Sequence, residues 1–106
     1  MKKLGLQILS QVSVFIRSIP EDEQLKIATE LESIREGDFE SAYIKTLRGP
    51  IKELISRKRR IIFCIEKEVL YVLRAFTKKS AKTPKRELEV SEQIYALLRK
   101  QIGQNK

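Results

Sequence analysis

The sequence contains no histidine, no tryptophan and only one cysteine among its 106 residues. Histidine is the usual general base near neutral pH and the commonest ligand of transition metals, so its absence excludes the ordinary forms of both kinds of site. A single cysteine can form neither a disulfide within the chain nor a cysteine-based metal site. We therefore expect no metal and no other cofactor. We expect Cys64, which lies in an apolar run, to be an inert core residue.

Long apolar runs are absent as well. No segment approaches the roughly 20 apolar residues that a transmembrane helix requires, so no association with a membrane is expected. Residues 1–10 resemble the charged and apolar parts of a signal peptide, but Gln7 and Ser10 interrupt the pattern and no cleavage site of small residues follows. Together with the lone cysteine, this predicts a cytoplasmic protein.

Positive charge is abundant and is concentrated in the middle of the chain. The net charge is +8, yet residues 1–44 carry five lysines and arginines against eight acidic residues. Residues 45–87 carry fourteen against four, a net charge of +10 for that segment. A regional excess of this kind indicates a surface for an anionic partner, and nucleic acid is the leading candidate.

The spacing of apolar residues predicts helices at both ends of the chain. Apolar residues recur at helical spacing over residues 4–19, and Pro20 ends that helix. A second helix is predicted over residues 21–37, with acidic residues in its first turn and a glycine at its end. The closing helix is predicted over residues 84–101.

The central segment is rich in β-branched and aromatic residues, which favour strands. Residues 51–56 are predicted to form one strand, and residues 60–65 and 69–76 the two strands of a hairpin. Residues 43–47 are either a short strand or a helical remnant. The predicted fold class is α+β, with two N-terminal helices, a small antiparallel sheet of about three to four strands and a C-terminal helix, in a single domain over residues 1–106.

The length of the hairpin loop decides where two arginines lie. A three-residue loop over residues 66–68 places Arg60 directly opposite Arg74, whereas a two-residue loop separates them. We predict the three-residue loop. Because like charges directly opposite one another are unfavourable, that pairing would indicate a bound anion.

The segment from Arg74 to Glu87 gathers lysines and arginines around Phe76 and ends in a helix start, where Thr83 is a good N-cap and Pro84 a good first residue. A cationic loop fixed between a strand and a helix can hold a phosphate backbone in register. Phe76 could stack on a base, although burial is the commoner fate of an aromatic residue.

Two further features have a plain structural alternative. The cations of residues 57–60 could bind nucleic acid or could be a solvated strand end. Glu53 could orient a cation or act as a base, but a salt bridge to Lys52 or Arg57 is the simpler interpretation.

Three segments carry a resemblance to a known family. They are Leu47-Arg-Gly-Pro-Ile-Lys-Glu-Leu54, Arg60-Ile-Ile-Phe63 and the stretch from Arg74 to Glu87. Over roughly residues 18–98 the chain resembles the phage-derived branch of RelE-like toxins, the group that includes HigB-type toxins. The resemblance implies a toxin of a type II toxin–antitoxin pair. Such a toxin is a metal-independent endoribonuclease that acts on mRNA at the ribosome, inhibits translation and is neutralised by a cognate antitoxin, often of the helix-turn-helix type.

The resemblance also assigns roles by position. Arg60 corresponds to the strand arginine that contacts phosphate, Arg74 stands where relatives often have a histidine, and the basic loop follows. The catalytic candidates are Arg60, Arg74 and Lys78, and the RNA-binding candidates are Lys52, Arg57, Arg59, Phe76, Lys79 and Lys82. Two departures are visible: Ile55 stands where relatives commonly have arginine, and the usual N-terminal strand is not evident. The alternative is a catalytically degenerate module of the same fold that binds RNA or an antitoxin.

Overall fold

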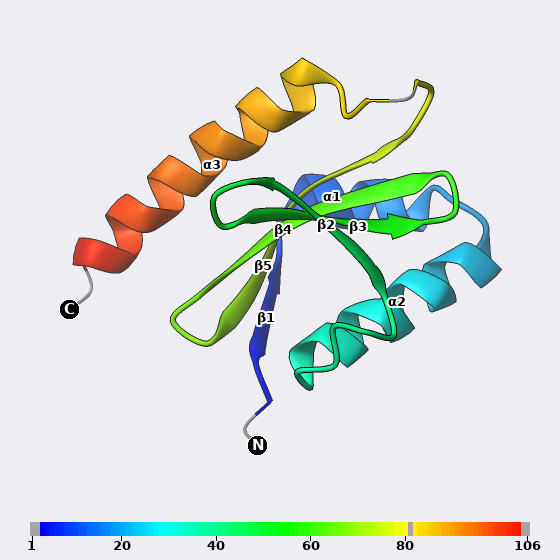
Figure 1. Cartoon of the computed structure of the whole chain (residues 1–106), viewed down its shortest axis with the longest axis horizontal. Coiled ribbons are helices and arrows are strands. Elements are labelled where there is room, and N and C mark those ends of the chain that lie inside the picture. The colour runs from blue at the N-terminus through cyan, green and yellow to red at the C-terminus, as the bar shows by residue number, and fades with distance from the viewer. Residues whose placement is uncertain (1–2, 81, 105–106) are drawn as a thin grey trace.

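The computed structural model describes residues 3–80 and 82–104. Its elements follow in the order β1 (Gly5–Ile8), α1 (Ser10–Arg17), α2 (Glu21–Arg35), β2 (Tyr43–Arg48), β3 (Ile51–Ser56), β4 (Arg59–Glu66), β5 (Val69–Thr77) and α3 (Lys85–Gln104). Helices α1 and α2 pack on one face of the sheet and α3 crosses the other (Figure 1). The predicted α+β class and the helices over residues 21–37 and 84–101 are confirmed, with slightly shifted bounds.

The sheet of the described residues has five strands in the order β1-β5-β4-β3-β2, more than the three to four predicted. It is mixed, because β1 runs parallel to β5 while the other neighbouring strands are antiparallel. The strand at residues 43–47, left open between strand and helix, is β2 and forms one edge.

The N-terminal segment corrects one prediction. Residues 4–19 do not form a single helix, since Gly5–Ile8 is strand β1 and the helix begins at Ser10. Backbone hydrogen bonds hold β1 at both ends, from Gly5 N to Glu68 O (2.9 Å) and from Leu9 N to Val72 O (3.2 Å). These partners lie more than sixty residues away along the chain, so local periodicity could not reveal them. The N-terminal strand that the sequence did not make evident is therefore present.

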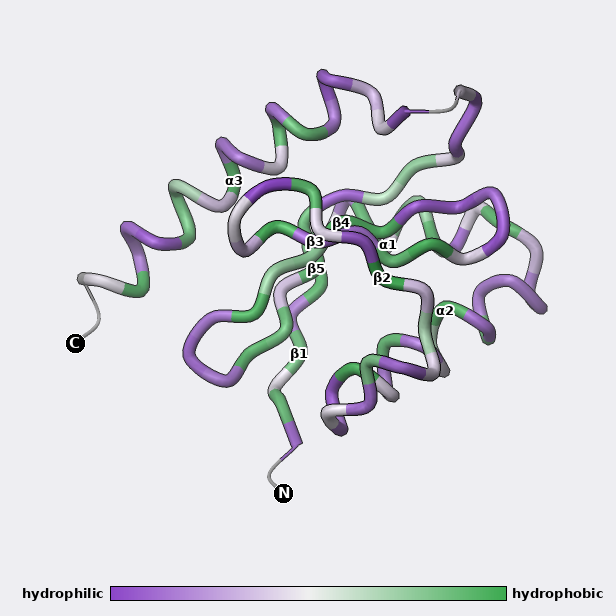
Figure 2. Tube along the Cα trace, in the orientation of Figure 1, coloured by the Kyte–Doolittle hydropathy of each residue, from purple (hydrophilic) through white to green (hydrophobic). Residues whose placement is uncertain are grey.

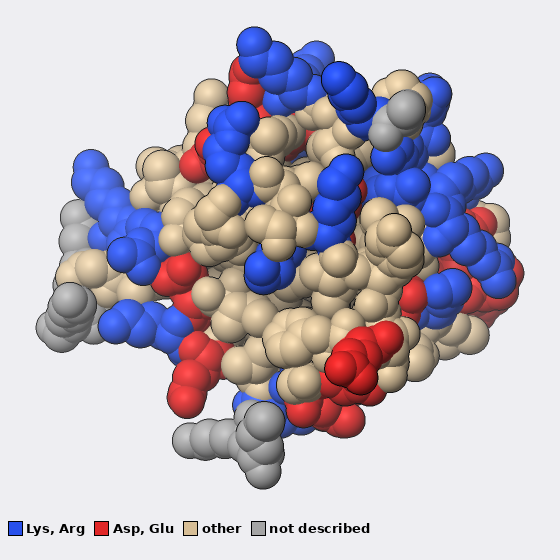
Figure 3. Space-filling view, in the orientation of Figure 1, with Lys and Arg blue, Asp and Glu red and all other residues tan. Residues whose placement is uncertain are grey.

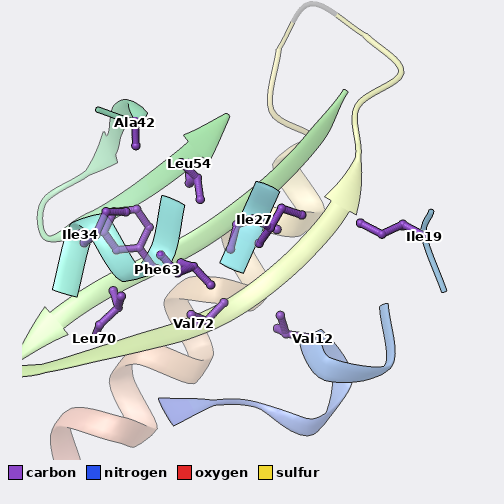
Figure 4. Close-up of a cluster of buried hydrophobic side chains, with 11 residues drawn as sticks. Val12, Ile19, Ile27, Ile34, Ala42, Leu54, Phe63, Leu70 and Val72 are labelled. Carbon is purple, nitrogen blue, oxygen red and sulfur yellow. The ribbon is translucent and has the colours of Figure 1, made fainter. Parts of the chain in front are cut away.

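The larger core lies between the sheet and the α1–α2 pair (Figure 4). Side chains from β3, β4 and β5 meet the apolar stripe of α2, and Phe63 of β4 is fully buried among them. Hydrophobic residues follow the strands, while the hairpin turns are strongly hydrophilic (Figure 2). Two smaller clusters lie under α3 and include Ile62, Phe76 and Tyr95.

The β4–β5 hairpin also differs from the prediction. Glu66 pairs with Val69, so the loop has two residues, Lys67 and Glu68, both with positive φ (49° and 63°). Positive φ at both central residues is the backbone of a tight two-residue turn whose twist matches that of the strands. The predicted three-residue loop is wrong, and Arg60 lies opposite Phe76 rather than Arg74. Because Arg60 and Arg74 are not paired, the argument that an anion binds between them no longer applies.

No helix of residues 3–80 and 82–104 is long and apolar enough to cross a membrane.

The core generates a prediction about stability. Phe63→Ala removes a fully buried ring and should lower the free energy of unfolding by about 3–5 kcal/mol, because the surrounding side chains cannot collapse into the space. Urea denaturation of both proteins measures the difference. Val14→Ala on the exposed side of α1 is the matched control and should change stability by about 0.5 kcal/mol or less. Equal effects of the two substitutions would contradict this account of the core.

Candidate nucleic-acid interface

A bulge in β5 decides which face of the sheet carries the key cations. Phe63 pairs with Val72 and Ile62 pairs with Arg74, which leaves Leu73 as an extra residue without a cross-strand partner. Because side chains alternate along a strand, one extra residue reverses the faces beyond it. The bulge therefore turns Arg74 toward α3, on the same face as Arg60, although the two do not face each other directly.

One end of the sheet gathers five cations that form no ion pair with any described residue. The backbone N–H of Lys78 donates to the carbonyl of Lys58 (2.7 Å), which brings the loop after β5 against the β3–β4 turn. Lysines and arginines crowd the surface over this region at the upper right of Figure 3. We call this group the basic end; its members are Lys58, Arg60, Lys78, Lys79 and Lys82.

Arg60 is the cation of the basic end that its surroundings restrain most. One guanidinium nitrogen, Nη1, donates to the backbone carbonyls of Arg57 (2.6 Å) and Arg59 (3.0 Å). Its Nε is buried and has no hydrogen-bond partner in the described part of the chain. The side chain is thus positioned by neutral groups, and no carboxylate of the described residues forms an ion pair with it.

Arg74, the second catalytic candidate, forms hydrogen bonds to two side chains of the protein itself. Its Nε donates to Glu87 Oε1 of α3 (2.8 Å) and its Nη1 to Gln11 Oε1 of α1 (2.9 Å). Both partners of the ion pair are largely buried, with side chains 24% and 18% exposed. Arg74 therefore ties α3 and α1 to the sheet.

Two of the RNA-binding candidates are bonded to α2. Arg59 makes a two-point ion pair with Glu23, Nε to Oε1 at 2.9 Å and Nη2 to Oε2 at 3.4 Å, and the side chains are only 11% and 12% exposed. Arg57, in the tight β3–β4 turn with φ of 56°, pairs with Asp22 (3.2 Å) in solvent. The hydrogen bond from Arg59 holds the pKa of the Glu23 carboxyl below its usual range. These arginines fasten the hairpin to α2.

Lys52 and Phe76 are also placed apart from the basic end. Lys52 pairs with Phe63 and Thr46 on the α1–α2 face of the sheet, so its ammonium lies on the opposite face from Arg60. Phe76 is 8% exposed and packs with Ile51 and Ile62, which leaves little of its ring for stacking on a base. Their RNA-binding roles stay predictions, without a shared surface to support them.

The burial of Glu53 and its hydrogen-bond partner were not predicted from the sequence. The expected salt bridge to Lys52 or Arg57 is wrong, because the Glu53 side chain is fully buried and its Oε2 accepts a hydrogen bond from the Thr83 hydroxyl (2.9 Å). Thr83 is not the N-cap of α3, because the N–H groups of Glu87 and Leu88 in the first turn donate to the carbonyl of Pro84. Thr83 and Glu53 are 30 residues apart, and no local pattern marks such a pair.

The far half of α3 is held by a second acid, Glu66, whose side chain is 13% exposed. Glu66 accepts hydrogen bonds from the Tyr95 hydroxyl (2.9 Å) and from Arg99 Nη1 (2.6 Å). Burial and the bond to Glu66 raise the pKa of Tyr95, so this hydroxyl stays protonated at neutral pH. The contacts fix the angle at which α3 crosses the sheet (Figure 1).

Other chemistry is sparse among the described residues. No three side chains of the metal-ligating types gather where they could hold a metal ion. Burial raises the pKa of the Cys64 thiol to about 12, which leaves it unreactive as a nucleophile. An apolar cleft of about 220 Å³ lies between α3 and the sheet, and Tyr71, Leu73 and Ile94 are among its walls.

Solved structures with the same architecture define the class of fold. A chain of the archaeal RelE–RelB complex from Pyrococcus horikoshii OT3 superposes with a TM-score of 0.62 at 19% identity, over 76% of this chain and 100% of that chain. A chain of the RelB–RelE antitoxin–toxin complex from Methanococcus jannaschii gives 0.58 at 11% identity, over 66% and 87%. The RelBE2 toxin–antitoxin complex from Mycobacterium tuberculosis gives 0.58 at 10% identity, over 72% and 99%. The fold is RelE-like.

The family follows from the sequence match. The family described as "Phage derived protein Gp49-like" matches residues 14–96, so the chain belongs to the phage-derived Gp49-like family. The predicted resemblance to the phage-derived, RelE-like branch is thereby confirmed. No curated protein matches the sequence.

The Arg59–Glu23 pair generates a prediction about pH. A carboxyl whose pKa is lowered in the folded state adds stability above its ordinary pKa, and that contribution is lost as the pH falls through the lowered value. Glu23→Gln should therefore be less stable than the parent at neutral pH, and the difference should shrink as the pH falls toward about 3. Urea unfolding across this range measures it.

The control is Glu21→Gln in the same helical turn, because Glu21 is exposed and joins no ion pair among the described residues. Its effect on the free energy of unfolding should be small at every pH. A Glu23→Gln difference that stays constant with pH would show that the carboxylate charge is not what holds the hairpin to α2.

Proposed function

We propose that this chain is the toxin of a type II toxin–antitoxin pair, a metal-independent endoribonuclease that cleaves mRNA on the ribosome and so inhibits translation in the cytoplasm. The observation that carries the proposal is the basic end. Its five cations have no carboxylate partner among the described residues, whereas neighbouring arginines of the same segment are paired. Uncompensated cations at one end of a sheet are suited to a phosphate backbone.

The proposed chemistry follows from charge. When a ribose 2′-hydroxyl attacks the adjacent phosphate, negative charge builds up on the phosphoryl oxygens, and preorganised cations stabilise it without a metal. Arg60 is assigned to the scissile phosphate because its guanidinium is held by the neutral Arg57 and Arg59 carbonyls. Lys78 is assigned to the developing charge, and Lys79 and Lys82 to the flanking backbone. Arg74 supports the site by positioning α3 through Glu87.

An antitoxin is the proposed protein partner. The solved structures that share this fold are described as complexes of a toxin with its antitoxin. An antitoxin segment with acidic side chains would complement the basic end and block access of RNA to it. A helix-turn-helix domain in that partner is part of the proposal.

A second candidate function is a module of the same fold that binds RNA or an antitoxin without cleaving RNA. The observation that favours it is the engagement of Arg74, because the ion pair with Glu87 removes one of the three catalytic candidates from the site. Ile55 also favours it, because relatives commonly have an arginine at this position and Ile55, which pairs with Arg60, supplies no positive charge to the site.

Expression in a bacterial host tests the proposal. The parent protein should arrest incorporation of radiolabelled methionine and fragment transcripts, and the purified protein should cleave mRNA that is bound to ribosomes. Arg60→Ala should slow cleavage by about a hundred-fold and relieve the arrest, because one preorganised charge donor is lost. Lys100→Ala, exposed near the far end of α3, is the matched control and should leave the arrest intact.

Two outcomes separate the candidates. RNA that is bound with a steep dependence on salt yet stays intact would favour the non-cleaving module. Undiminished translation and no binding of RNA would tell against both.

A further inference from the structure

Glu53 is a buried acid without a cation. Its side chain is fully buried in β3; Oε2 accepts a hydrogen bond from the Thr83 hydroxyl, and Oε1 has no partner in the described part of the chain. Burying a carboxylate costs free energy unless it is paired, so the residue is poorly explained as a stabilising contact. Because this acid lies beneath the basic end, we looked for a role that connects it with those cations.

We call the connection between β5 and α3 the basic loop, after its lysines Lys78, Lys79 and Lys82. The Glu53–Thr83 hydrogen bond lies at one end of it. At the other end, the N–H of Lys78 donates to the carbonyl of Lys58 (2.7 Å). Lys78 and Thr83 are thus each bonded to the β3–β4 hairpin, and Lys79 and Lys82 lie between them along the chain. Neighbouring lysines repel one another, so an unfastened loop would spread and lose the arrangement of its charges.

Thr83 is well placed to transmit the position of Glu53 to the loop. Pro84 follows it, and the residue before a proline is confined largely to extended backbone. The helix begins directly afterwards, with Glu87 N and Leu88 N bonded to the Pro84 carbonyl (3.0 and 3.3 Å). The hydroxyl therefore joins a rigid helix start to a rigid strand.

Glu53 also lies close to Arg60 on the sheet. Arg60 pairs with Ile55, two residues along β3 from Glu53, so the acid and the arginine are diagonal neighbours on one face. The unpartnered buried atoms of this face, Glu53 Oε1 and Arg60 Nε, belong to these two residues.

We propose that Glu53 is a positioning residue which, through its hydrogen bond to the Thr83 hydroxyl, holds the basic loop in the conformation that binds an RNA backbone. This rests on the proposed function only in that RNA is the ligand. Glu53 does not touch RNA, because its side chain is fully buried. Its effect is carried by Lys79 and Lys82.

The test compares Thr83→Val, which removes the hydroxyl, with Thr83→Ser, which keeps it. Affinity for a short fluorescent single-stranded RNA, methylated at its 2′-hydroxyls to prevent cleavage, is measured at several salt concentrations where each variant is folded. Thr83→Val should weaken binding about ten-fold and lower the salt slope by roughly 0.7 for each phosphate that the loop no longer binds. Thr83→Ser should restore affinity to within about two-fold. Thr29→Val on the exposed side of α2 is the matched control.

Coupling separates positioning from general stability. In a Lys79→Ala/Lys82→Ala background, Thr83→Val should weaken binding by less than about two-fold, since the groups that it positions are gone. An equal loss in both backgrounds, or no loss in the parent, would overturn the proposal. Glu53→Gln, which keeps a hydrogen-bond acceptor, should bind better than Thr83→Val; if it binds worse, the charge of Glu53 rather than its bond to Thr83 is what matters, and the proposal fails.

Hydrogen exchange distinguishes failure of this inference from failure of the proposed function. Thr83→Val should speed exchange of the Lys78, Glu87 and Leu88 amides, which are hydrogen-bonded at the two ends of the basic loop, while leaving the β4 amides protected. If Thr83→Val has this effect on exchange but the parent protein binds no RNA, the proposed function is refuted while the role of the Glu53–Thr83 bond in holding the loop stands. Exchange that is unchanged at these amides would refute that role.

Discussion

The structure depends above all on the backbone of the β4–β5 hairpin. A two-residue turn at Lys67 and Glu68 sets the pairing near the turn, and the extra residue Leu73 shifts it by one beyond the bulge. With an unbroken ladder, Arg74 would face the α1–α2 core opposite Ile61. The bulge instead turns Arg74 toward α3, where it forms an ion pair with Glu87, and places Phe76 opposite Arg60. The packing of α3 and the exposure of the basic end both follow from this irregularity.

Two groups of cations in the middle segment have different roles. Arginines that meet carboxylates hold elements together, as Arg59 does with Glu23 of α2 and Arg48 with Glu92 of α3. The five cations of the basic end, which have no carboxylate partner among the described residues, lie together at one end of the sheet (Figure 3). Net charge alone cannot separate the groups, because the same residue types serve both. The separation comes from the positions of acidic residues on α2 and α3, which the chain folds against the sheet.

Sequence reasoning could predict features whose causes are local. Helix α2 begins directly after Pro20, and strand β3 spans the predicted residues 51–56. Features that depend on residues far away in the sequence were not predicted. Strand β1 depends on pairing with β5, and the turn at Lys67 adopts positive φ without the glycine or asparagine that usually marks one. Burial of Phe76 and engagement of Arg59 likewise required knowledge of what packs across the sheet.

In the proposed function, the hydrogen-bond partners of the two arginines are the reason for assigning phosphate to Arg60 rather than to Arg74. Moving Arg74 onto a phosphate would leave Glu87, a largely buried carboxylate, without its cation, and that loss opposes binding. Among the described residues Arg60 has no ion pair to give up, because its guanidinium bonds there to the neutral carbonyls of Arg57 and Arg59. An incoming anion can take the free face of that guanidinium without breaking a charge pair. Because arginine and phosphate form strong, often bidentate hydrogen bonds, the uncommitted side of the Arg60 guanidinium suits an anion in the proposed site.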